Sequence, residues 1–345
     1  MKVAHVLWSF KYGGIETMIV DILNEQVKTD KVALFIINDN IDNRLITKID
    51  ENVKIVKVGR PLGSKNPYYL IKLNMQIVGY NPDVIHCHMD GLHRVIKVPY
   101  AMVRTIHSTH FDIKKNTYYK ECTAISKAVL CECEKRGIHA TLVLNGIDCD
   151  TIKKKEDWSS PKEFHFVQLS RILFCHKGQD VLIRALKKLK DEGIENFKMH
   201  FVGEGPDMTE LVNLIKDNGL EPNVILEGAK SRDWVYEHMC DFDLFIHPAR
   251  FEGFGLAVAE ACAAKVPVLV SNIEGPMEII NQGKYGMTFE SEDVDSLAGR
   301  IKEFMQNGYN MDLVEGAYEY TKMNFNVVNT SKMYLDVYKR TLSLS

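Results

Sequence analysis

Short apolar segments that resemble strands alternate with amphipathic segments that resemble helices along nearly the whole chain. In the first half the strand-like segments lie at residues 3–10, 32–37, 53–58, 84–88, 103–107, 123–126 and 141–144. After the first of them, apolar residues recur at helical spacing at Ile15, Met18, Ile19, Ile22 and Leu23. Strands that alternate with helices predict a parallel sheet with helices on both faces, so we expect an α/β fold.

A polar stretch at residues 153–163 interrupts this alternation, which then resumes with strand-like segments at 164–169, 199–202, 224–226, 244–247 and 267–270. A chain of 345 residues is too long for one ordinary core and suits two domains. We predict two Rossmann-like parallel-sheet domains that face a cleft, where strand ends bind ligands. The expected parts are an N-terminal domain (1–155), a linker (156–163), a C-terminal domain (164–320) and a final helical segment (321–345).

Charge and cysteine content indicate the cellular compartment and the kind of membrane contact to expect. Residues 1–150 carry a net charge of +4, whereas the whole chain carries −3. A mildly basic N-terminal half favours an anionic membrane surface or acceptor, although solubility explains so small an excess equally well. The eight cysteines show no Cys-x-x-Cys spacing, so the sequence indicates neither a zinc site nor redox chemistry. Several lie within apolar segments, as reduced buried cysteines do, which indicates a reducing cytosol. We expect no signal peptide, and no apolar run reaches membrane-spanning length, so any membrane contact is expected to be peripheral.

Residues 244–264 form the most informative motif of the chain. An apolar strand at 244–247 is closed by Pro248, a loop with two glycines follows, and helix-forming residues begin at Leu256. Such a loop offers backbone N–H groups and the positive end of a helix dipole to an anion. Glu252 in the loop and Glu260 in the helix would disfavour phosphate alone, but they suit a nucleotide sugar with hydroxyl groups at both ends. The alternative is an ordinary strand and helix with surface glutamates.

The sequence His247-Pro-Ala-Arg-Phe-Glu-Gly-Phe-Gly-Leu, followed by Ala-Glu-Ala, resembles the Glu-seven-Glu signature of family 4 of the retaining glycosyltransferases (glycosyl transferases group 1), which have the GT-B fold. The resemblance covers nearly the whole chain and is stronger beyond residue 160. Arg171 and Lys177, six residues apart, match the family's pair that holds the donor diphosphate; a solvated basic pair is the alternative. The family often has an acidic residue between them, where this chain has Phe174 and Cys175.

The resemblance implies a role for each of these residues. Glu260 would accept hydrogen bonds from the donor ribose, and Glu252 would hold sugar hydroxyls and orient the reacting carbon. Arg171 and Lys177 would stabilise the departing diphosphate together with the backbone amides of the loop. The donor-binding loop residues are Gly253, Phe254, Gly255 and Leu256.

Residues near strand ends of the first half supply further candidates. Gly13 and Gly14 allow close approach of a ligand to the backbone, and the resemblance places their loop against the diphosphate and the acceptor. His107 resembles a family position where a histidine assists catalysis by hydrogen bonding. His86 and His88 are predicted to pack locally or line the cleft, and His110 receives no role.

We predict no metal site. No carboxylate completes a ligand set with the histidines. A second metal-like motif, Asp241-Phe-Asp243, precedes a buried strand rather than ending one, so it is predicted to be structural.

The resemblance implies transfer of a sugar from a UDP- or GDP-sugar, with UDP favoured, to a hydroxyl of a glycan or lipid-linked acceptor, with retained anomeric configuration. The expected setting is surface polysaccharide or glycolipid synthesis in the cytoplasm, at the inner face of the plasma membrane, with peripheral contact through the N-terminal domain. No cofactor and no nucleic acid are expected.

Three alternatives stay open. A nucleotide-sugar 2-epimerase shares the fold, and a catalytically silent nucleotide-sugar-binding protein would keep the same residues. An NAD-dependent dehydrogenase would need a complete glycine fingerprint, which Tyr12-Gly-Gly does not supply.

Overall fold

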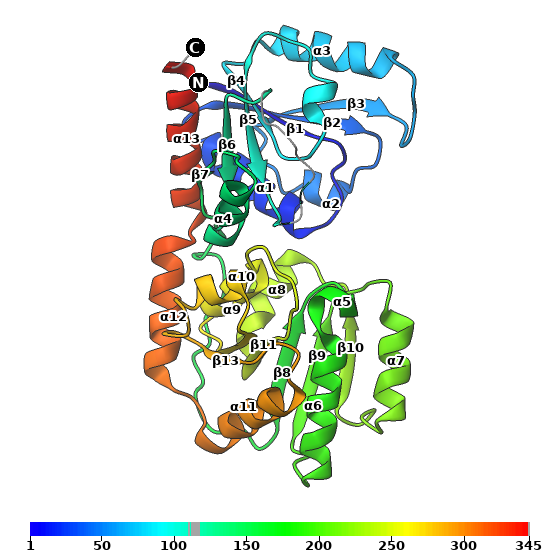
Figure 1. The fold of residues 1–345 in the computed structure, drawn as a ribbon, viewed down its shortest axis with the longest axis vertical. Helices are drawn as coiled ribbons and strands as arrows, with labels where there is room; N and C mark the ends of the chain where they lie inside the picture. Colours follow the sequence, from blue (N-terminus) through cyan, green and yellow to red (C-terminus); the bar gives the residue numbers. More distant parts are fainter. Residues whose placement is uncertain (110, 112–117, 344–345) are drawn as a thin grey trace. The chain divides into compact units, whose positions relative to one another are not determined.

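The computed structural model describes residues 1–109, 111 and 118–343, and His110 lies outside them. Contacts divide the chain into two compact units (Figure 1). Unit 1 comprises Met1–Ile147 and Asn326–Ser345, and unit 2 comprises Asp148–Phe325. The sequence placed the domain boundaries after residues 155 and 320, whereas this division places them after 147 and 325.

The sheet of unit 1 has seven parallel strands in the order β3-β2-β1-β4-β5-β6-β7. Its central strands are almost entirely buried, as apolar strands covered on both faces must be. All seven predicted segments are strands, with bounds that differ by a few residues. The strands are β1 (Lys2–Leu7), β2 (Lys31–Asn38), β3 (Lys54–Arg60), β4 (Val84–Cys87), β5 (Ala101–Ile106), β6 (Glu121–Ala124) and β7 (Thr141–Leu142).

Helices flank this sheet. The predicted helix after the first strand is confirmed as α1, and the predicted helix near the C-terminus is confirmed as α13. Tyr334 and Tyr338 of α13 are fully buried, because α13 packs against α1 and β5. The helices of unit 1 are α1 (Gly14–Gln26), α2 (Asn43–Ile46), α3 (Tyr68–Tyr80), the 3-10 helix η1 (Leu92–Arg94), α4 (Lys127–Lys135) and α13 (Val327–Ser343).

The sheet of unit 2 has six parallel strands in the order β10-β9-β8-β11-β12-β13. The five predicted segments are confirmed as strands, and the short edge strand β13 was not predicted. Phe166, Leu244 and Leu269 of the central strands belong to a large apolar core. The strands are β8 (Phe164–Leu169), β9 (Phe197–Val202), β10 (Val224–Gly228), β11 (Leu244–His247), β12 (Val268–Ser271) and β13 (Met287–Phe289).

Helices also cover the sheet of unit 2, and α6 and α11 contribute Leu186, Leu297 and Ile301 to its core. The helices are α5 (Phe174–Lys177), α6 (Gln179–Asp191), α7 (Met208–Asp217), α8 (Arg232–His238), the 3-10 helix η2 (Met239–Asp241), α9 (Leu256–Ala263), α10 (Glu274–Ile279), α11 (Val294–Asn307) and α12 (Met311–Asn324). Over the described residues, no helix is both long and apolar enough to cross a bilayer.

Both sheets have a point where the strand order reverses. In unit 1 this point lies between β1 and β4, and in unit 2 it lies between β8 and β11. In open α/β sheets, ligands bind beyond the carboxyl ends of the strands at such a reversal. The loops after β1, β4, β8 and β11 are therefore the candidate ligand-binding loops.

Candidate functional site

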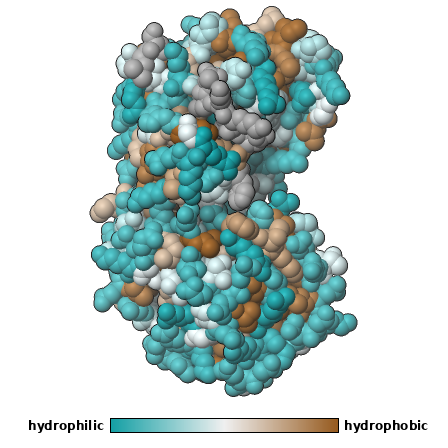
Figure 2. Space-filling model, in the orientation of Figure 1, coloured by the Kyte–Doolittle hydropathy of each residue, from teal (hydrophilic) through white to brown (hydrophobic). Residues whose placement is uncertain are grey.

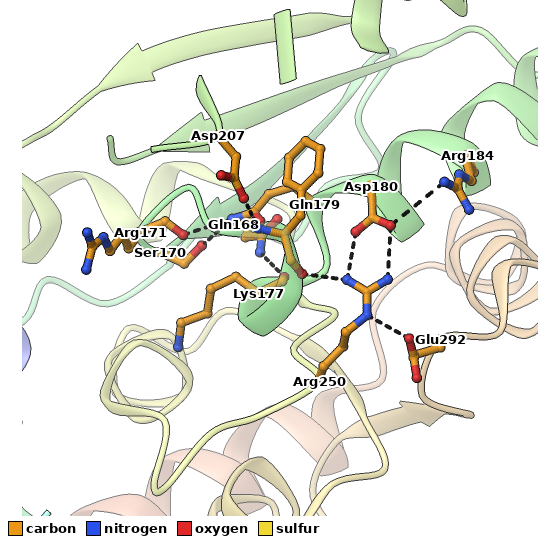
Figure 3. Close-up of polar contacts among 11 residues, drawn as sticks. Gln168, Ser170, Arg171, Lys177, Gln179, Asp180, Arg184, Asp207, Arg250 and Glu292 are labelled. Carbon is orange, nitrogen blue, oxygen red and sulfur yellow. Dashed lines mark hydrogen bonds and ion pairs between the residues drawn. The ribbon is translucent and has the colours of Figure 1, made fainter. Parts of the chain in front are cut away.

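The loop after β8 is held in place by two buried glutamines (Figure 3). Gln168 Nε2 donates to the carbonyl oxygen of Lys177 at 2.9 Å. Gln179 Nε2 donates to Ser170 Oγ and to the carbonyl oxygen of Arg171, both at 3.0 Å. These bonds fix the main chain of both predicted cationic residues and leave their charged ends outside the core.

The two cations differ in their surroundings. Arg171 is exposed, and its guanidinium has no hydrogen-bond or ion-pair partner among the described residues. In Figure 3 its side chain extends away from the core of the loop. Lys177, in contrast, is half-buried and its Nζ lies 2.6 Å from Glu252 Oε2. Arg171 is therefore available to an anion without breaking any internal contact.

The loops after β8 and β11 touch through the backbone at Gly178. Its φ of +65° lies in the left-handed region, and a Cβ there would stand 1.9 Å from the carbonyl oxygen of Pro248. Only glycine fits such a close approach. The amides of Arg250 and Phe251 also donate to the carbonyl oxygen of His176, at 2.8 and 3.2 Å. These contacts bring the segment of Lys177 against the segment of Glu252.

Glu252 lies between a lysine and a histidine. Besides Lys177, His247 places its Nε2 3.4 Å from the same carboxylate oxygen. Burial acts to raise the pKa of Glu252, but the contact with His247 and the charge of Lys177 outweigh it and hold this pKa well below its ordinary value. Burial lowers the pKa of His247, so its ring is neutral at pH 7. Glu252 is therefore a charged acceptor, and it remains about one fifth exposed (19%).

The loop from Gly253 to Leu256 leads into α9. Gly255 precedes the helix at φ +103°, which glycine adopts readily, and no side chain caps the first turn. The first N–H groups of a helix have no partner within the helix, so this end of α9 can donate to an anion. Phe254 is buried, and its ring lies edge-on to Phe325 at 5.3 Å. Aromatic packing therefore anchors the loop that precedes α9.

Glu260 lies within α9 and is partly buried. The beginning of α10 packs closely on the preceding loop, since a Cβ on Gly275 would stand 2.6 Å from the carbonyl oxygen of Glu252. Helix α10 begins at Glu274, and Pro276 is its third residue. Both carboxylates of the predicted pair thus belong to the same loop-and-helix segment.

Arg250 holds this segment in place through hydrogen bonds, and it was not among the predicted site residues. Its guanidinium donates to both carboxylate oxygens of Asp180, at 2.8 and 2.9 Å, and to the carbonyl oxygen of Phe174 at 2.5 Å. It also donates to Glu292 at 2.7 Å (Figure 3). The neighbouring Asp180 raises the pKa of Arg250. Arg250 stood in the quoted motif, but its partners are far away in the sequence, so no local pattern pointed to this network.

Both aspartates of the Asp241-Phe-Asp243 motif accept hydrogen bonds from residues of unit 2. Asp243 accepts from the backbone amide of His165 at 2.8 Å, from Lys155 Nζ at 3.2 Å and from the Tyr309 hydroxyl at 2.5 Å. Asp241 accepts from His238 Nδ1 at 2.8 Å. Asp243 thus ties the segment after residue 150 to the start of β11.

The remaining candidates belong to unit 1. Gly13 and Gly14 follow β1, and Gly13 is the residue before α1. A Cβ on Gly13 would stand 2.8 Å from Glu16 Oε2, so this carboxylate lies over the glycine. Burial raises the pKa of Glu16. His107 directly follows β5, at the same carboxyl edge of the sheet as the glycine loop.

The histidines of unit 1 form a buried cluster that includes His5, which the sequence analysis missed. His5, His86 and His88 offer ring nitrogens within 4.8 Å of one another. His5 Nε2 lies 2.8 Å from Gln26 Oε1, and His5 Nδ1 lies 2.8 Å from His88 Nε2. Because an amide oxygen only accepts, His5 Nε2 carries the proton and His88 Nε2 donates to His5 Nδ1. Hydrogen bonds thus use both His5 nitrogens.

His86 continues the cluster toward the C-terminal helix. Its Nδ1 lies 2.6 Å from the Tyr338 hydroxyl and its Nε2 lies 2.6 Å from Thr105 Oγ1. His107 approaches His88 with 5.8 Å between ring centroids. Burial lowers the pKa of His5 to about 4 and of His107 to about 3, and it places the pKa of His86 and His88 well below 6.5. All four rings are therefore neutral at pH 7.

The chain is similar to known proteins in sequence and in fold. An uncharacterized glycosyltransferase of Methanocaldococcus jannaschii is 25% identical over 89% of this chain and 89% of its own. A GDP-mannose-dependent alpha-(1-6)-phosphatidylinositol monomannoside mannosyltransferase of Mycobacterium tuberculosis is 32% identical over 40% of this chain and 37% of its own. The Anabaena protein HepE, crystallised with UDP and glucose, superposes with a TM-score of 0.80 at 20% identity, over 98% of this chain and 99% of that chain.

The structural likeness confirms the predicted GT-B fold, with two parallel-sheet α/β domains. The family Glycosyl transferases group 1 matches residues 150–322, half of the chain, which include Arg171, Lys177, Glu252 and Glu260. The chain therefore belongs to the family Glycosyl transferases group 1, and it is a glycosyltransferase.

Proposed function

We propose that this protein is a retaining glycosyltransferase of family 4 that moves a sugar from a nucleoside diphosphate to a hydroxyl acceptor. The observation that carries the proposal is the Lys177–Glu252 pair, with 2.6 Å between Nζ and Oε2, beside the uncapped start of α9. A lysine, a charged carboxylate and free helix amides on one sheet edge suit a ligand that has both phosphate and hydroxyl groups.

Unit 2 holds the donor in this proposal. Lys177, the unpaired Arg171 and the amides of Gly253 to Leu256 bind the diphosphate, whose charge grows as the glycosidic bond breaks. When the donor binds, a phosphate replaces Glu252 as the partner of Lys177. Glu252 then accepts hydrogen bonds from sugar hydroxyls, and Glu260 accepts hydrogen bonds from the ribose. Before the donor binds, the low pKa of Glu252 keeps its carboxylate charged and ready to accept.

We propose a front-face reaction. The bond between the anomeric carbon and the phosphate oxygen breaks, the acceptor oxygen bonds to the same face of that carbon, and the acceptor proton passes to the departing phosphate. The anomeric configuration is thereby retained. His107, whose neutral ring can both donate and accept, assists by hydrogen bonding to the donor sugar, and the loop of Gly13 and Gly14 contacts diphosphate and acceptor.

The reaction is proposed to need no metal ion and no cofactor. Two cationic side chains and the dipole of α9 already oppose the diphosphate charge, so this proposal predicts that EDTA leaves the rate unchanged.

Donor and acceptor are proposed from chemistry and from the relatives. HepE, which was crystallised with UDP, resembles this chain over nearly its full length, and this favours a UDP-sugar donor. The mycobacterial relative, in contrast, uses GDP-mannose. That relative acts on a phosphatidylinositol monomannoside, so a glycan or lipid-linked acceptor in surface polysaccharide or glycolipid synthesis is proposed. Action in the cytoplasm, with peripheral contact of the N-terminal domain at the inner face of the plasma membrane, completes the proposal.

The test combines binding and product analysis. Thermal unfolding is measured with UDP, GDP, ADP, CMP and NAD, with and without EDTA, since a ligand at about 100 times its Kd stabilises by about 2.7 kcal/mol. A shift with UDP or GDP that EDTA does not reduce supports the donor site, and NMR of the product then reads the anomeric configuration. An inverted product contradicts the retaining mechanism. Release of an epimerised nucleotide sugar identifies a 2-epimerase instead, and a shift with NAD alone overturns the proposal.

A further inference from the structure

Helix α3 (Tyr68–Tyr80) is apolar on two opposite faces. Its inner face buries Leu73, Ile77 and Tyr80 against the rest of unit 1. Its outer face exposes large apolar side chains, namely Tyr68 (58%), Ile71 (59%), Met75 (69%) and Val78 (51%). With about 3.6 residues per turn, these four positions lie in one stripe roughly opposite the buried one. Figure 2 shows hydrophobic residues gathered at the upper end of the molecule, where Figure 1 draws α3.

This outer stripe is unusual for a surface. Single exposed apolar residues are common on soluble proteins, whereas a contiguous apolar patch marks an interaction site. Leu62, in the loop between β3 (Lys54–Arg60) and α3, is also 66% exposed. Neither packing within unit 1 nor the proposed donor site explains these side chains.

The stretch of sequence that contains α3 is basic. From Asn52 to Pro82 the chain has five basic residues and no acidic one. Lys57 and Lys65 are exposed, and neither has a hydrogen-bond or ion-pair partner among the described residues. A second copy of this chain on the same face would bring these like charges together, which opposes self-association. An anionic surface with an apolar interior complements both features.

We propose that the outer face of α3 docks on an anionic lipid bilayer, with Tyr68, Ile71, Met75 and Val78 in the headgroup and acyl boundary and with Lys57 and Lys65 at lipid phosphates. The helix lies in the plane of the interface and does not cross it. This inference deepens the proposed membrane contact and rests on it, but it does not depend on the sugar-transfer chemistry.

The test is cosedimentation of the full chain with vesicles of phosphatidylcholine alone, or of phosphatidylcholine and phosphatidylglycerol in equal amounts, without any donor. We expect binding to the anionic vesicles only, and less binding at high salt. Ile71→Ser with Met75→Ser should weaken partitioning by roughly tenfold or more, because two apolar anchors are lost. Each of Lys57→Gln and Lys65→Gln should weaken it about fivefold, which corresponds to ~1 kcal/mol per charge.

The matched control changes exposed apolar residues of unit 2, Val212→Ser with Met323→Ser, which should bind as the wild type does. Ile71→Trp gives a second readout, since its emission should shift to the blue only with anionic vesicles. Absence of vesicle binding, or equal binding by the Ile71→Ser and Met75→Ser double variant, overturns the proposal. So does a wild-type dimer that this variant dissociates. Donor binding is measured separately, so a failed transfer assay and a failed docking surface are distinct results.

Discussion

Glu252 and Lys177 contact each other although each is proposed to contact a ligand. The contact is short, with 2.6 Å between the charged atoms, and both side chains retain about one fifth of their exposure. Such a pair can open without uncovering core residues, because Lys177 ends the one-turn helix α5 and Glu252 lies in the loop before α9. A phosphate would replace the carboxylate as the partner of Lys177, and sugar hydroxyls would replace the lysine as partners of Glu252. The pair thus prepares both side chains for a ligand that has both groups.

Glu252→Gln tests this interpretation at a single atom. The amide keeps the shape but loses the charge, so we expect kcat to fall by about 10²–10³ if the carboxylate orients the donor sugar. The measurement is transfer rate with the donor that stabilises the wild type. Glu221→Gln, an exposed residue of unit 2, serves as the control and should keep full activity. Unchanged turnover of Glu252→Gln with a normal melting temperature would contradict a role of this residue.

Several candidate residues could be named from the sequence because their signal is local. Glu252, Lys177 and Arg171 stand at fixed spacings next to strand and helix ends. Arg250 and His5 could not be predicted in this way. Arg250 donates to Asp180, which lies seventy positions away in the sequence, and His5 bonds to the similarly remote His88. Only the folded chain brings these partners together.

At the scale of elements, the strands of both sheets could be predicted because buried parallel strands are short apolar runs. The edge strand β13 was missed, since it has three residues and only Phe289 is buried. The loops that carry the site were not predictable in shape. Their geometry depends on backbone contacts between the loops after β8 and β11, such as the approach of Gly178 to Pro248.

Gly178→Ala should show how strongly these two loops depend on each other. The new Cβ would stand 1.9 Å from the carbonyl oxygen of Pro248, and φ is +65°. We expect a loss of about 1–2 kcal/mol in the free energy of unfolding from the backbone strain and a further ~1–3 kcal/mol from the clash.

The matched control is Gly193→Ala, where φ is +81° but nothing lies within 4 Å of the new Cβ. It should lose only the strain contribution. Urea unfolding measures both variants. Equal destabilisation of the two would show that the contact between the loops contributes no stability.

At the scale of the whole molecule, the two units differ in their buried titratable groups. Unit 1 holds His5, His86, His88 and His107, whose pKa values burial lowers from 6.5, to about 4 for His5 and about 3 for His107. A lowered histidine pKa means that the unfolded chain binds protons that the folded chain does not. Stability is therefore complete above pH 6.5 and falls as the pH drops from 6.5 toward 4. Unit 2 holds fewer such rings among its described residues, namely His200 and His247, whose pKa burial also lowers. The low pKa of Glu252 matters only below about pH 4.5, its ordinary value.

Acid should therefore open unit 1 before unit 2. Each buried histidine makes the free energy of unfolding fall by about 1.4 kcal/mol per pH unit once the pH is well below 6.5. Hydrogen-exchange protection factors, measured between pH 7 and 5, should drop for amides of β1, β4 and β5 while those of β8 and β9 persist. His5→Asn removes one titrating ring and should flatten this dependence, whereas the exposed His139→Asn should leave it unchanged. Equal loss of protection in both sheets would contradict the assignment, because unit 2 would then carry an acid-sensitive group of equal strength.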